Sequence, residues 1–443
     1  MYTSYIGKKF LKLYNDREGK KKSAKEFFDE IFFDLFFQDD SHLMHVGNSP
    51  FFQKPKEEDV KQYGSKSLAQ LNNLRNAIEK DVPNMSIFVG FAAKDMQGTT
   101  SGKLTSLDFQ IDENEVYASW IGEALAIGVS GGFIMQIDKE DILWALFTGW
   151  KYYRNYLQQT PNVKDKQIET WNGHWLSHSF GKNYNLDDPW EGFEVETNNV
   201  QGNIAIPTQD WSKVIFALSQ RYPNEVITAY CYNLSQTNTT LGFINIYLPE
   251  VRRLYELRDI IFLDEKKSVL KDKQIQELET FYNFKNACKL GTIGLKALEP
   301  NNLRTYMPKG SVMYAQGKDF KFTYETSYFN YQLYKIWIIA MLNKTELLNL
   351  AAEVAKALLD FEKPKEGKNE RGKTTSSRLS EEIKDASNIR VFIEKLTEML
   401  EESSSNAETF KNVVEQTLKM PTDNFPLFAT LIRFEYQYQK SKN

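Results

Sequence analysis

Two stretches, Glu225-Val-Ile-Thr-Ala-Tyr-Cys-Tyr232 and Leu241-Gly-Phe-Ile-Asn-Ile-Tyr247, decide the fold class of this chain. Both are rich in the β-branched and aromatic residues that favour strands. Between them, Asn233-Leu-Ser-Gln-Thr-Asn-Thr-Thr240 is a run of amide and hydroxyl side chains that is typical of a turn. The pattern predicts a β-hairpin.

The residues before this hairpin combine helical and strand patterns. Ser23-Ala-Lys-Glu26 is a capping box at the start of a Phe-rich helix, and further helices are expected at Ser65–Lys80 and Asp138–Gln158. Met85–Phe91 and Gly131–Ile137 are expected to be strands. The stretch from Ser119 to Gly132 lacks P-loop and G-x-G-x-x-G spacing, so we expect a turn with positive φ angles. A phosphate-binding nest is the alternative.

After the hairpin, Val251–Leu257 and Lys271–Leu290 are expected to be helical, and strong helical patterns then fill the end of the chain. Polar connectors at Glu362–Ser377 and Glu401–Asn406 separate them. We therefore predict an α+β fold, with a mixed domain at residues 1–322 and an all-α helical bundle at residues 323–443. The bundle helices are expected at Ser327–Phe361, Ser380–Glu402, Ala407–Lys419 and Asn424–Lys440.

The composition excludes several classes of protein. The chain has 443 residues, of which 41% are hydrophobic and 14% aromatic, enough to bury large cores. Two cysteines cannot form a disulfide framework or a Cys-rich zinc ribbon. The first residues lack an apolar signal-peptide core, and no apolar run approaches the length of a membrane span. We expect a cytoplasmic protein.

The charge is unevenly distributed along the chain. The net charge is −4, yet residues 1–26 hold eight basic side chains against three acidic ones, and residues 282–322 hold seven against two. Such blocks indicate either an anion-facing surface or two solvated faces. The second block also interleaves aromatic residues with its basic ones, as single-stranded nucleic-acid grooves do.

These patterns give a set of candidate nucleic-acid-binding residues. Lysines and arginines would contact phosphates, and the amides of the predicted turn would contact base edges. A plain polar hairpin tip is the alternative for the turn. The candidates are Lys8, Lys9, Lys12, Lys20, Lys21 and Lys22, then Asn233, Gln236 and Asn238, then Lys285, Lys289, Arg304 and Lys309.

Catalytic patterns are weak. His174 and His178 have the i, i+4 spacing of a zinc helix, but Trp175 occupies the position of the catalytic Glu. Cys231 is a possible nucleophile, although a lone Cys within an apolar strand is usually core. We expect no cofactor and no metal.

Three stretches resemble the large subunit of a type I CRISPR effector complex, Cascade. They are Met1-Tyr-Thr-Ser-Tyr-Ile-Gly-Lys-Lys9, Asn48-Ser-Pro-Phe51 and Asn424-Phe-Pro-Leu-Phe-Ala-Thr-Leu-Ile-Arg-Phe-Glu-Tyr-Gln-Tyr-Gln-Lys440. The layout of a mixed domain followed by a helical bundle agrees. The paired C-x-x-C motifs of some relatives are absent, so a zinc-bearing version is not expected.

This resemblance implies a non-catalytic subunit of an antiviral defence complex. Such a subunit grips the end of the guide RNA, reads a short duplex motif in the target DNA and contacts the other effector subunits. A separate nuclease then cleaves the DNA. Two alternatives remain open: a metal-dependent restriction-type endonuclease using Asp259, Asp264 and Lys266, and a protein-interaction scaffold.

Overall fold

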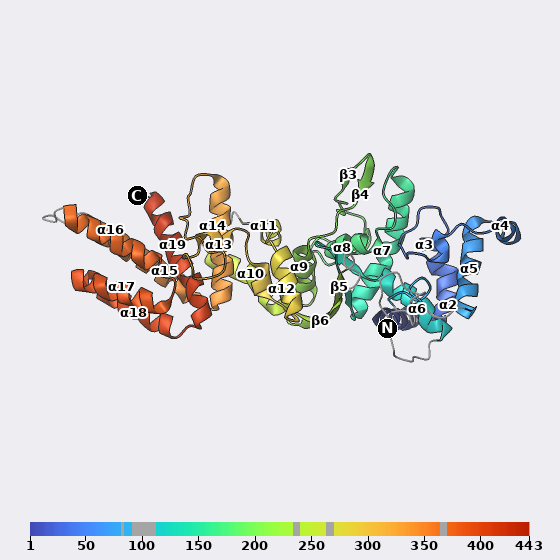
Figure 1. The fold of residues 1–443 in the computed structure, drawn as a ribbon, viewed down its shortest axis with the longest axis horizontal. Coiled ribbons are helices and arrows are strands. Elements are labelled where there is room, and N and C mark those ends of the chain that lie inside the picture. The colour runs from blue at the N-terminus through green and yellow to red at the C-terminus, as the bar shows by residue number, and fades with distance from the viewer. Residues whose placement is uncertain (81–83, 91–111, 234–239, 263–269, 364–369, 443) are drawn as a thin grey trace. The chain divides into compact units, whose positions relative to one another are not determined.

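The computed structural model describes residues 1–80, 84–90, 112–233, 240–262, 270–363 and 370–442 (Figure 1). The chain forms two compact units. The first comprises Met1–Pro249 and Phe284–Ile293, and the second comprises Glu250–Asn283 and Gly294–Asn443. The expected boundary at residue 322 falls within the second unit.

The first unit begins with helices whose buried sides are dominated by aromatic rings. The predicted capping box is present, because Ser23 and Glu26 exchange side chain to backbone hydrogen bonds. Phe28, Phe32 and Phe36 recur every fourth residue and stack, with the last two ring centroids 4.1 Å apart. The elements are α1 (Tyr2–Glu18), α2 (Ala24–Phe27), the π-helical turn η1 (Phe28–Phe32), α3 (Phe33–Phe36), η2 (Pro50–Phe52), α4 (Glu57–Tyr63), α5 (Lys66–Lys80) and α6 (Glu113–Ala124).

A five-stranded sheet with the order β1-β2-β5-β6-β7 lies in this unit. Neighbouring strands are antiparallel except β6 and β7, which are parallel. The predicted hairpin is confirmed, since β5 and β6 pair from Val226 opposite Tyr247 to Tyr232 opposite Thr240. The strands are β1 (Ile127–Val129), β2 (Phe133–Ile137), β5 (Val226–Asn233), β6 (Thr240–Tyr247) and β7 (Thr292–Ile293).

The glycine-rich stretch before β2 ends in a tight turn, as predicted. Gly131 and Gly132 have φ angles of 88° and 74°, in the left-handed region that favours glycine. They join β1 to β2, which pair directly across them. The glycines therefore serve the backbone of the sheet.

Four more helices and a second hairpin complete the first unit. Phe284 packs its ring 4.9 Å from Phe133 and 4.4 Å from Trp211, so this part of α12 is anchored to β2 and α9. The elements are α7 (Glu140–Gln159), α8 (Ile168–Ser179), β3 (Asn198–Val200), β4 (Asn203–Ala205), α9 (Trp211–Arg221) and, from Phe284 onwards, α12 (Phe281–Lys289).

Helices account for most of the second unit, and α19 is its central element. Every residue from Phe425 to Tyr436 is buried, because α19 packs against α14, α15 and α16. A helix that is buried all round belongs to a core. The elements are α10 (Leu248–Ile261), α11 (Asp272–Gln276), η4 (Leu295–Leu298), α13 (Leu303–Tyr306), α14 (Glu325–Leu342), α15 (Glu346–Glu362), α16 (Glu370–Lys384), α17 (Ile389–Glu402), η5 (Ser404–Asn406), α18 (Ala407–Leu418), η6 (Thr422–Asn424) and α19 (Phe425–Lys442).

The predicted α+β class and its helical C-terminal region are confirmed, but some predicted elements are wrong. The expected helix Ser327–Phe361 is two helices, because Asn343 takes a φ angle of 58° and ends α14. The expected helix Lys271–Leu290 is also broken, between α11 and α12.

Two other stretches differ from the prediction. The expected strand Met85–Phe91 forms turns over its described residues, where the Asn84 carbonyl accepts hydrogen bonds from the amides of Ile87 and Phe88. The polar connector predicted after Glu362 is helical from Glu370 onwards. Gly372 and the Thr and Ser residues that follow are poor helix formers, so helix propensity does not account for this part of α16.

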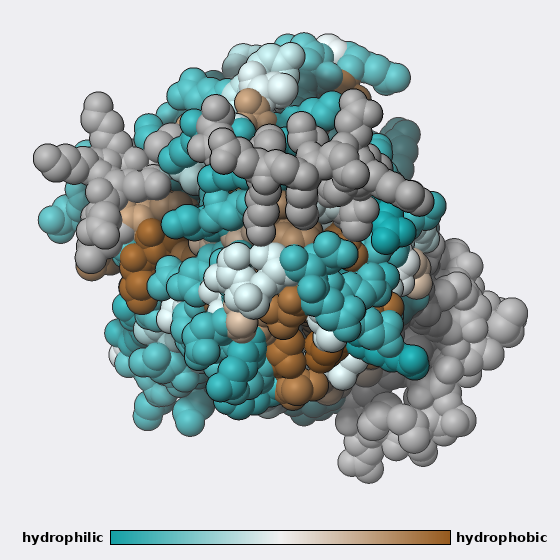
Figure 2. Space-filling model, turned by 90° about the vertical axis from the view of Figure 1, so that its left-hand side faces the viewer, coloured by the Kyte–Doolittle hydropathy of each residue, from teal (hydrophilic) through white to brown (hydrophobic). Residues whose placement is uncertain are grey.

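One end of the second unit is largely polar. Figure 2 shows the end of this unit with mostly hydrophilic side chains and a short apolar strip between them. None of the described helices is both long and apolar enough to cross a membrane.

Candidate nucleic-acid interface

Helix α1 carries the first group of predicted lysines and is held by a close crossing with α6. A Cβ atom on Gly7 would lie 1.8 Å from the Ala118 carbonyl oxygen, and one on Gly122 would lie 1.8 Å from that of Thr3. The two backbones are therefore in direct contact. Ile6 and Phe10 of α1 are fully buried, so the opposite side of this helix faces solvent.

The structure divides these lysines into two groups. Lys8, Lys9 and Lys22 form ion pairs with acidic residues. Lys12 lies exposed on α1, and Lys20 and Lys21 lie exposed just beyond its C-terminal Gly19. None of these last three forms an ion pair with a residue that the structure describes. We call Lys12, Lys20 and Lys21 the basic strip. The acidic partners are Glu115 for Lys8, Asp138 for Lys9 and Glu30 for Lys22.

The second group of predicted cations is split between the two units. Lys285 and Lys289 lie exposed on the part of α12 that belongs to the first unit. Arg304 and Lys309 belong to the second unit. Arg304 donates two hydrogen bonds of 2.7 and 2.9 Å to Glu299, so its charge is already compensated. The structure does not assemble the four into one site within either unit.

The predicted amide turn is described at its two ends, Asn233 and Thr240, and of its candidate residues only Asn233 is described. Asn233 is the last residue of β5 and pairs with Phe133 of β2. Gln236 and Asn238 lie outside the described residues.

A second amide-rich hairpin was missed by the sequence analysis. β3 and β4 are joined by Gln201 and Gly202, with φ angles of 53° and 85°, as a tight two-residue turn requires. The Asn199 side chain accepts a hydrogen bond from the Gly202 amide at 3.1 Å and stabilises the turn. In Figure 1 this hairpin extends as a narrow ribbon. Its exposed Gln201 is of the residue type that hydrogen-bonds base edges.

The histidine pair has structural partners instead of a metal. The His174 Nε2–H donates to the Pro207 carbonyl at 2.7 Å, and its Nδ1 accepts from Gln209 at 3.3 Å. His178 Nε2 donates to the Pro189 carbonyl at 2.9 Å. Burial lowers the pKa of both imidazoles, so they stay neutral. Within the described ranges, no group of three His, Cys, Asp or Glu side chains is placed to hold a metal.

The other catalytic candidates have structural surroundings as well. Cys231 is buried, and its contact with Cys288 and its burial raise the pKa of its thiol, which makes it a poor nucleophile. Asp259 lies on α10, where it forms an ion pair with Arg258 at 2.8 Å. Asp264 and Lys266 lie outside the described residues.

Two carboxyl groups, the buried Glu123 and the partly buried Glu169, have strongly raised pKa values. Glu123 on α6 accepts hydrogen bonds from the Tyr232 hydroxyl at 2.9 and 3.0 Å. Burial raises the pKa of Glu123 to about 7. Burial and the nearby Glu123 charge raise the pKa of Glu169, at the start of α8, to about 8. Such pairs occur at catalytic sites, but buried acids without a cationic neighbour also arise in structural cores.

This pair predicts that stability falls as the pH rises. A carboxyl with an ordinary pKa when unfolded and a raised pKa when folded favours the folded state at low pH. That contribution is lost as the pH passes through about 7 and about 8, the pKa values of Glu123 and Glu169. We expect the Tm of the wild type to fall from pH 6 to pH 9, and that of Glu169→Gln to fall less. Thermal unfolding at constant ionic strength measures this.

The exposed Glu225, in the same unit, supplies the control. Glu225→Gln should follow the wild-type pH profile. Parallel profiles for Glu169→Gln and the wild type would show that the pair does not titrate in this range.

Comparison with known proteins gave no match to a family model, to a curated protein or to a solved structure.

Proposed function

We propose that this chain is a non-catalytic, nucleic-acid-binding large subunit of a type I CRISPR RNA-guided defence complex. It would contact the guide RNA and the target DNA alongside the other protein subunits. The basic strip carries the proposal, because its three exposed lysines lie on α1 or just beyond its C-terminal end and have no acidic partner among the described residues. The first residues of this helix belong to a stretch that resembles that family. Exposed lysines of this kind are suited to phosphate contacts.

The charge of the chain favours binding within an assembly. A net charge of −4 gives little general attraction to free nucleic acid. Four of the seven lysines in residues 1–26, Lys8, Lys9, Lys22 and Lys25, are also neutralised by acids, which leaves a small number of local phosphate contacts. A subunit that relies on partners to hold the same RNA needs no more than this. The proposed location is the cytoplasm.

Base-edge contacts would come from exposed amides. Gln201 at the tip of the β3–β4 hairpin is such a group, and Asn233 borders the turn predicted for this role. Gln201→Ala should therefore change sequence preference on duplex DNA more than it changes total affinity. A competition assay with duplexes that differ at single base pairs measures this preference, and identical preferences would remove the hairpin from the interface.

Charge reversal of the basic strip tests the proposal on the purified chain. The triple variant Lys12→Glu, Lys20→Glu, Lys21→Glu should bind a short fluorescein-labelled single-stranded RNA about tenfold or more weakly at moderate salt. The slope of log affinity against log salt should also fall by about 2, roughly 0.7 for each phosphate that the variant no longer neutralises. Fluorescence anisotropy over a range of salt measures both quantities.

A matched control carries the same change of charge elsewhere. Lys356, Lys411 and Lys419 are exposed on or beside helices of the second unit, so reversing all three should leave RNA affinity near the wild-type value. Equal loss in both triple variants would mean that net charge decides binding, which contradicts a local site. Metal-dependent cleavage of DNA by the wild type would instead support the endonuclease.

A further inference from the structure

The outer face of the β5–β6 hairpin exposes aromatic rings beside α1. Successive side chains of a strand alternate between faces. Ile227, Ala229, Ile244 and Ile246 are buried on one face. On the other, Phe243 is 59% exposed and Tyr247 is 36% exposed. Exposed rings on a flat sheet are costly in water unless a partner covers them.

Two tyrosines of α1 extend this surface. The Tyr2 ring lies 4.8 Å from Tyr230 of β5 and 5.3 Å from Phe243 of β6, measured between centroids. Tyr5 follows at 5.6 Å from Tyr2 and is 48% exposed. Residues from both ends of the first unit thus form one cluster, which we call the aromatic face. Its members are Tyr2, Tyr5, Tyr230 and Phe243.

Hydrogen-bonding groups share the same side of the sheet. Thr228 is paired with Asn245 across the strands, and its hydroxyl donates to the Asn245 amide oxygen at 2.9 Å. Thr292 of β7 is the next residue in register and is exposed. Hydroxyl and amide groups beside stacked rings can bond the 2′-hydroxyl of a ribose.

The charge beside the aromatic face is suited to phosphates. Tyr5, Lys9 and Lys12 are four and three residues apart, so they lie along one side of α1. Lys9 and the Tyr5 hydroxyl both contact Asp138, so the acid nearest the rings is compensated. The segment of residues 1–26 has eight basic side chains against three acidic ones. An RNA backbone placed over the rings could therefore reach Lys12, which lies on the same side of α1 and forms no ion pair with a described residue.

We infer that the aromatic face binds single-stranded RNA by stacking unpaired bases on Tyr5 and Phe243, while Lys12 and the rest of the basic strip contact the phosphates. This inference rests on the proposed function and assigns a site to it. Base stacking on exposed rings is the mechanism by which proteins hold single strands without reading every base.

Two truncations and two controls test the inference on the full chain. Phe243→Ala and Tyr5→Ala should each weaken binding of a short single-stranded RNA about fivefold or more, because each removes one stacking partner. Phe243→Tyr keeps the ring and should bind as the wild type does. Leu290, an apolar side chain of the same unit that is 83% exposed, supplies the second control, and Leu290→Ala should leave binding unchanged.

The mode of binding is tested by salt and by crosslinking. The ring variants should keep the wild-type salt slope, because stacking is removed while every phosphate contact stays in place. RNA containing 5-iodouridine should crosslink on irradiation to peptides that contain Tyr5 or Phe243. Thermal unfolding of each variant checks that the fold is intact.

The outcomes separate this inference from the proposed function. If Phe243→Ala and Tyr5→Ala both bind RNA with wild-type affinity, the aromatic face is not the binding site. Weaker RNA binding by the basic-strip variant would in that case still support the proposed function. Equal binding of single-stranded DNA would overturn the assignment to RNA. Loss of co-purifying protein subunits in Phe243→Ala, with unchanged RNA binding, would identify a protein partner instead. If the wild type binds neither RNA nor duplex DNA, both the aromatic face as a binding site and the proposed function are rejected.

Discussion

Gly122→Ala is expected to lower the free energy of unfolding by about 3 kcal/mol or more, although alanine is the better helix former. The helix preference for alanine is worth about 1 kcal/mol. The added Cβ atom would lie 1.8 Å from the Thr3 carbonyl oxygen and 2.9 Å from the Gly7 amide nitrogen. Both neighbours are backbone atoms, which cannot rotate away, so α1 and α6 must separate. The clash therefore outweighs the helix preference.

Urea unfolding monitored by circular dichroism measures this change. Gly47 supplies the control, because a Cβ there would meet a single atom within 4 Å, the Nε2 of His45 at 3.7 Å. Gly47→Ala should change stability by less than about 0.5 kcal/mol. RNA binding should fall in Gly122→Ala, since α1 carries both Tyr5 and Lys12. A stable Gly122→Ala protein would contradict the described helix crossing.

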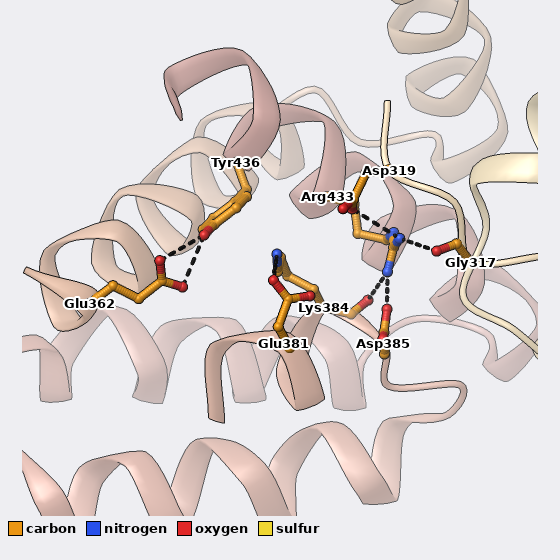
Figure 3. Close-up of polar contacts among 8 residues, drawn as sticks. All are labelled: Gly317, Asp319, Glu362, Glu381, Lys384, Asp385, Arg433 and Tyr436. Atoms are coloured by element: carbon orange, nitrogen blue, oxygen red, sulfur yellow. Dashed lines mark hydrogen bonds and ion pairs between the residues drawn. The ribbon is translucent and has the colours of Figure 1, made fainter. Parts of the chain in front are cut away.

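Arg433→Met is expected to cost the second unit about 3 kcal/mol. Arg433 lies on α19 and is 3% exposed. Its guanidinium donates to the Gly317 carbonyl at 2.7 Å and to the Lys384 carbonyl at 3.2 Å, and it also contacts Asp385 and Asp319 (Figure 3). Methionine fills part of the volume but leaves these acceptors without their donor. The two carboxylates are half exposed, so water offsets part of the loss.

A neighbouring network rests on the same helix. The Tyr436 hydroxyl, one turn along α19, donates to Glu362, and its ring lies 3.8 Å from the Lys384 ammonium (Figure 3). Differential scanning calorimetry of Arg433→Met measures the loss. Arg390 is the control, because it is 87% exposed and pairs with Glu394 on the surface of α17. Arg390→Met should change stability by less than about 0.5 kcal/mol. Equal stability of both variants would contradict a structural role for Arg433.

The parts of the fold that were predicted correctly depend on local patterns. The β5–β6 hairpin follows from alternation on both sides of a polar turn, and the helix at Ser23 follows from its capping box. The Gly131–Gly132 turn follows from glycine at consecutive positions before a strand. Each of these signals lies within about ten residues, so no tertiary contact is needed to recognise it.

The predictions of secondary structure failed where the structure depends on tertiary contacts or on the backbone angle of a single residue. Asn343 is of a residue type that can end a helix, but the apolar helical pattern continues beyond it, so the end of α14 is recognised from its positive φ angle in the folded backbone. The three-residue strands β3 and β4 are too short and too polar to show alternation. The turns at Met85 depend on hydrogen bonds to the Asn84 carbonyl.

The candidate interface was predicted in part for the same reason. A cluster of lysines is visible in the sequence, but the pairing of Lys8 with Glu115 spans 107 residues and depends on the α1–α6 crossing. The aromatic face needs Tyr2 to meet strands more than 200 residues away. The histidine pair had the spacing of a zinc helix, yet both rings bond backbone carbonyls.

The most direct test of the central claim is to purify the tagged chain from its native host and identify what accompanies it. The proposed function predicts a small RNA of defined length together with several other protein subunits, and loss of that RNA from the basic-strip variant. A monomer or dimer without RNA or partner subunits would contradict it.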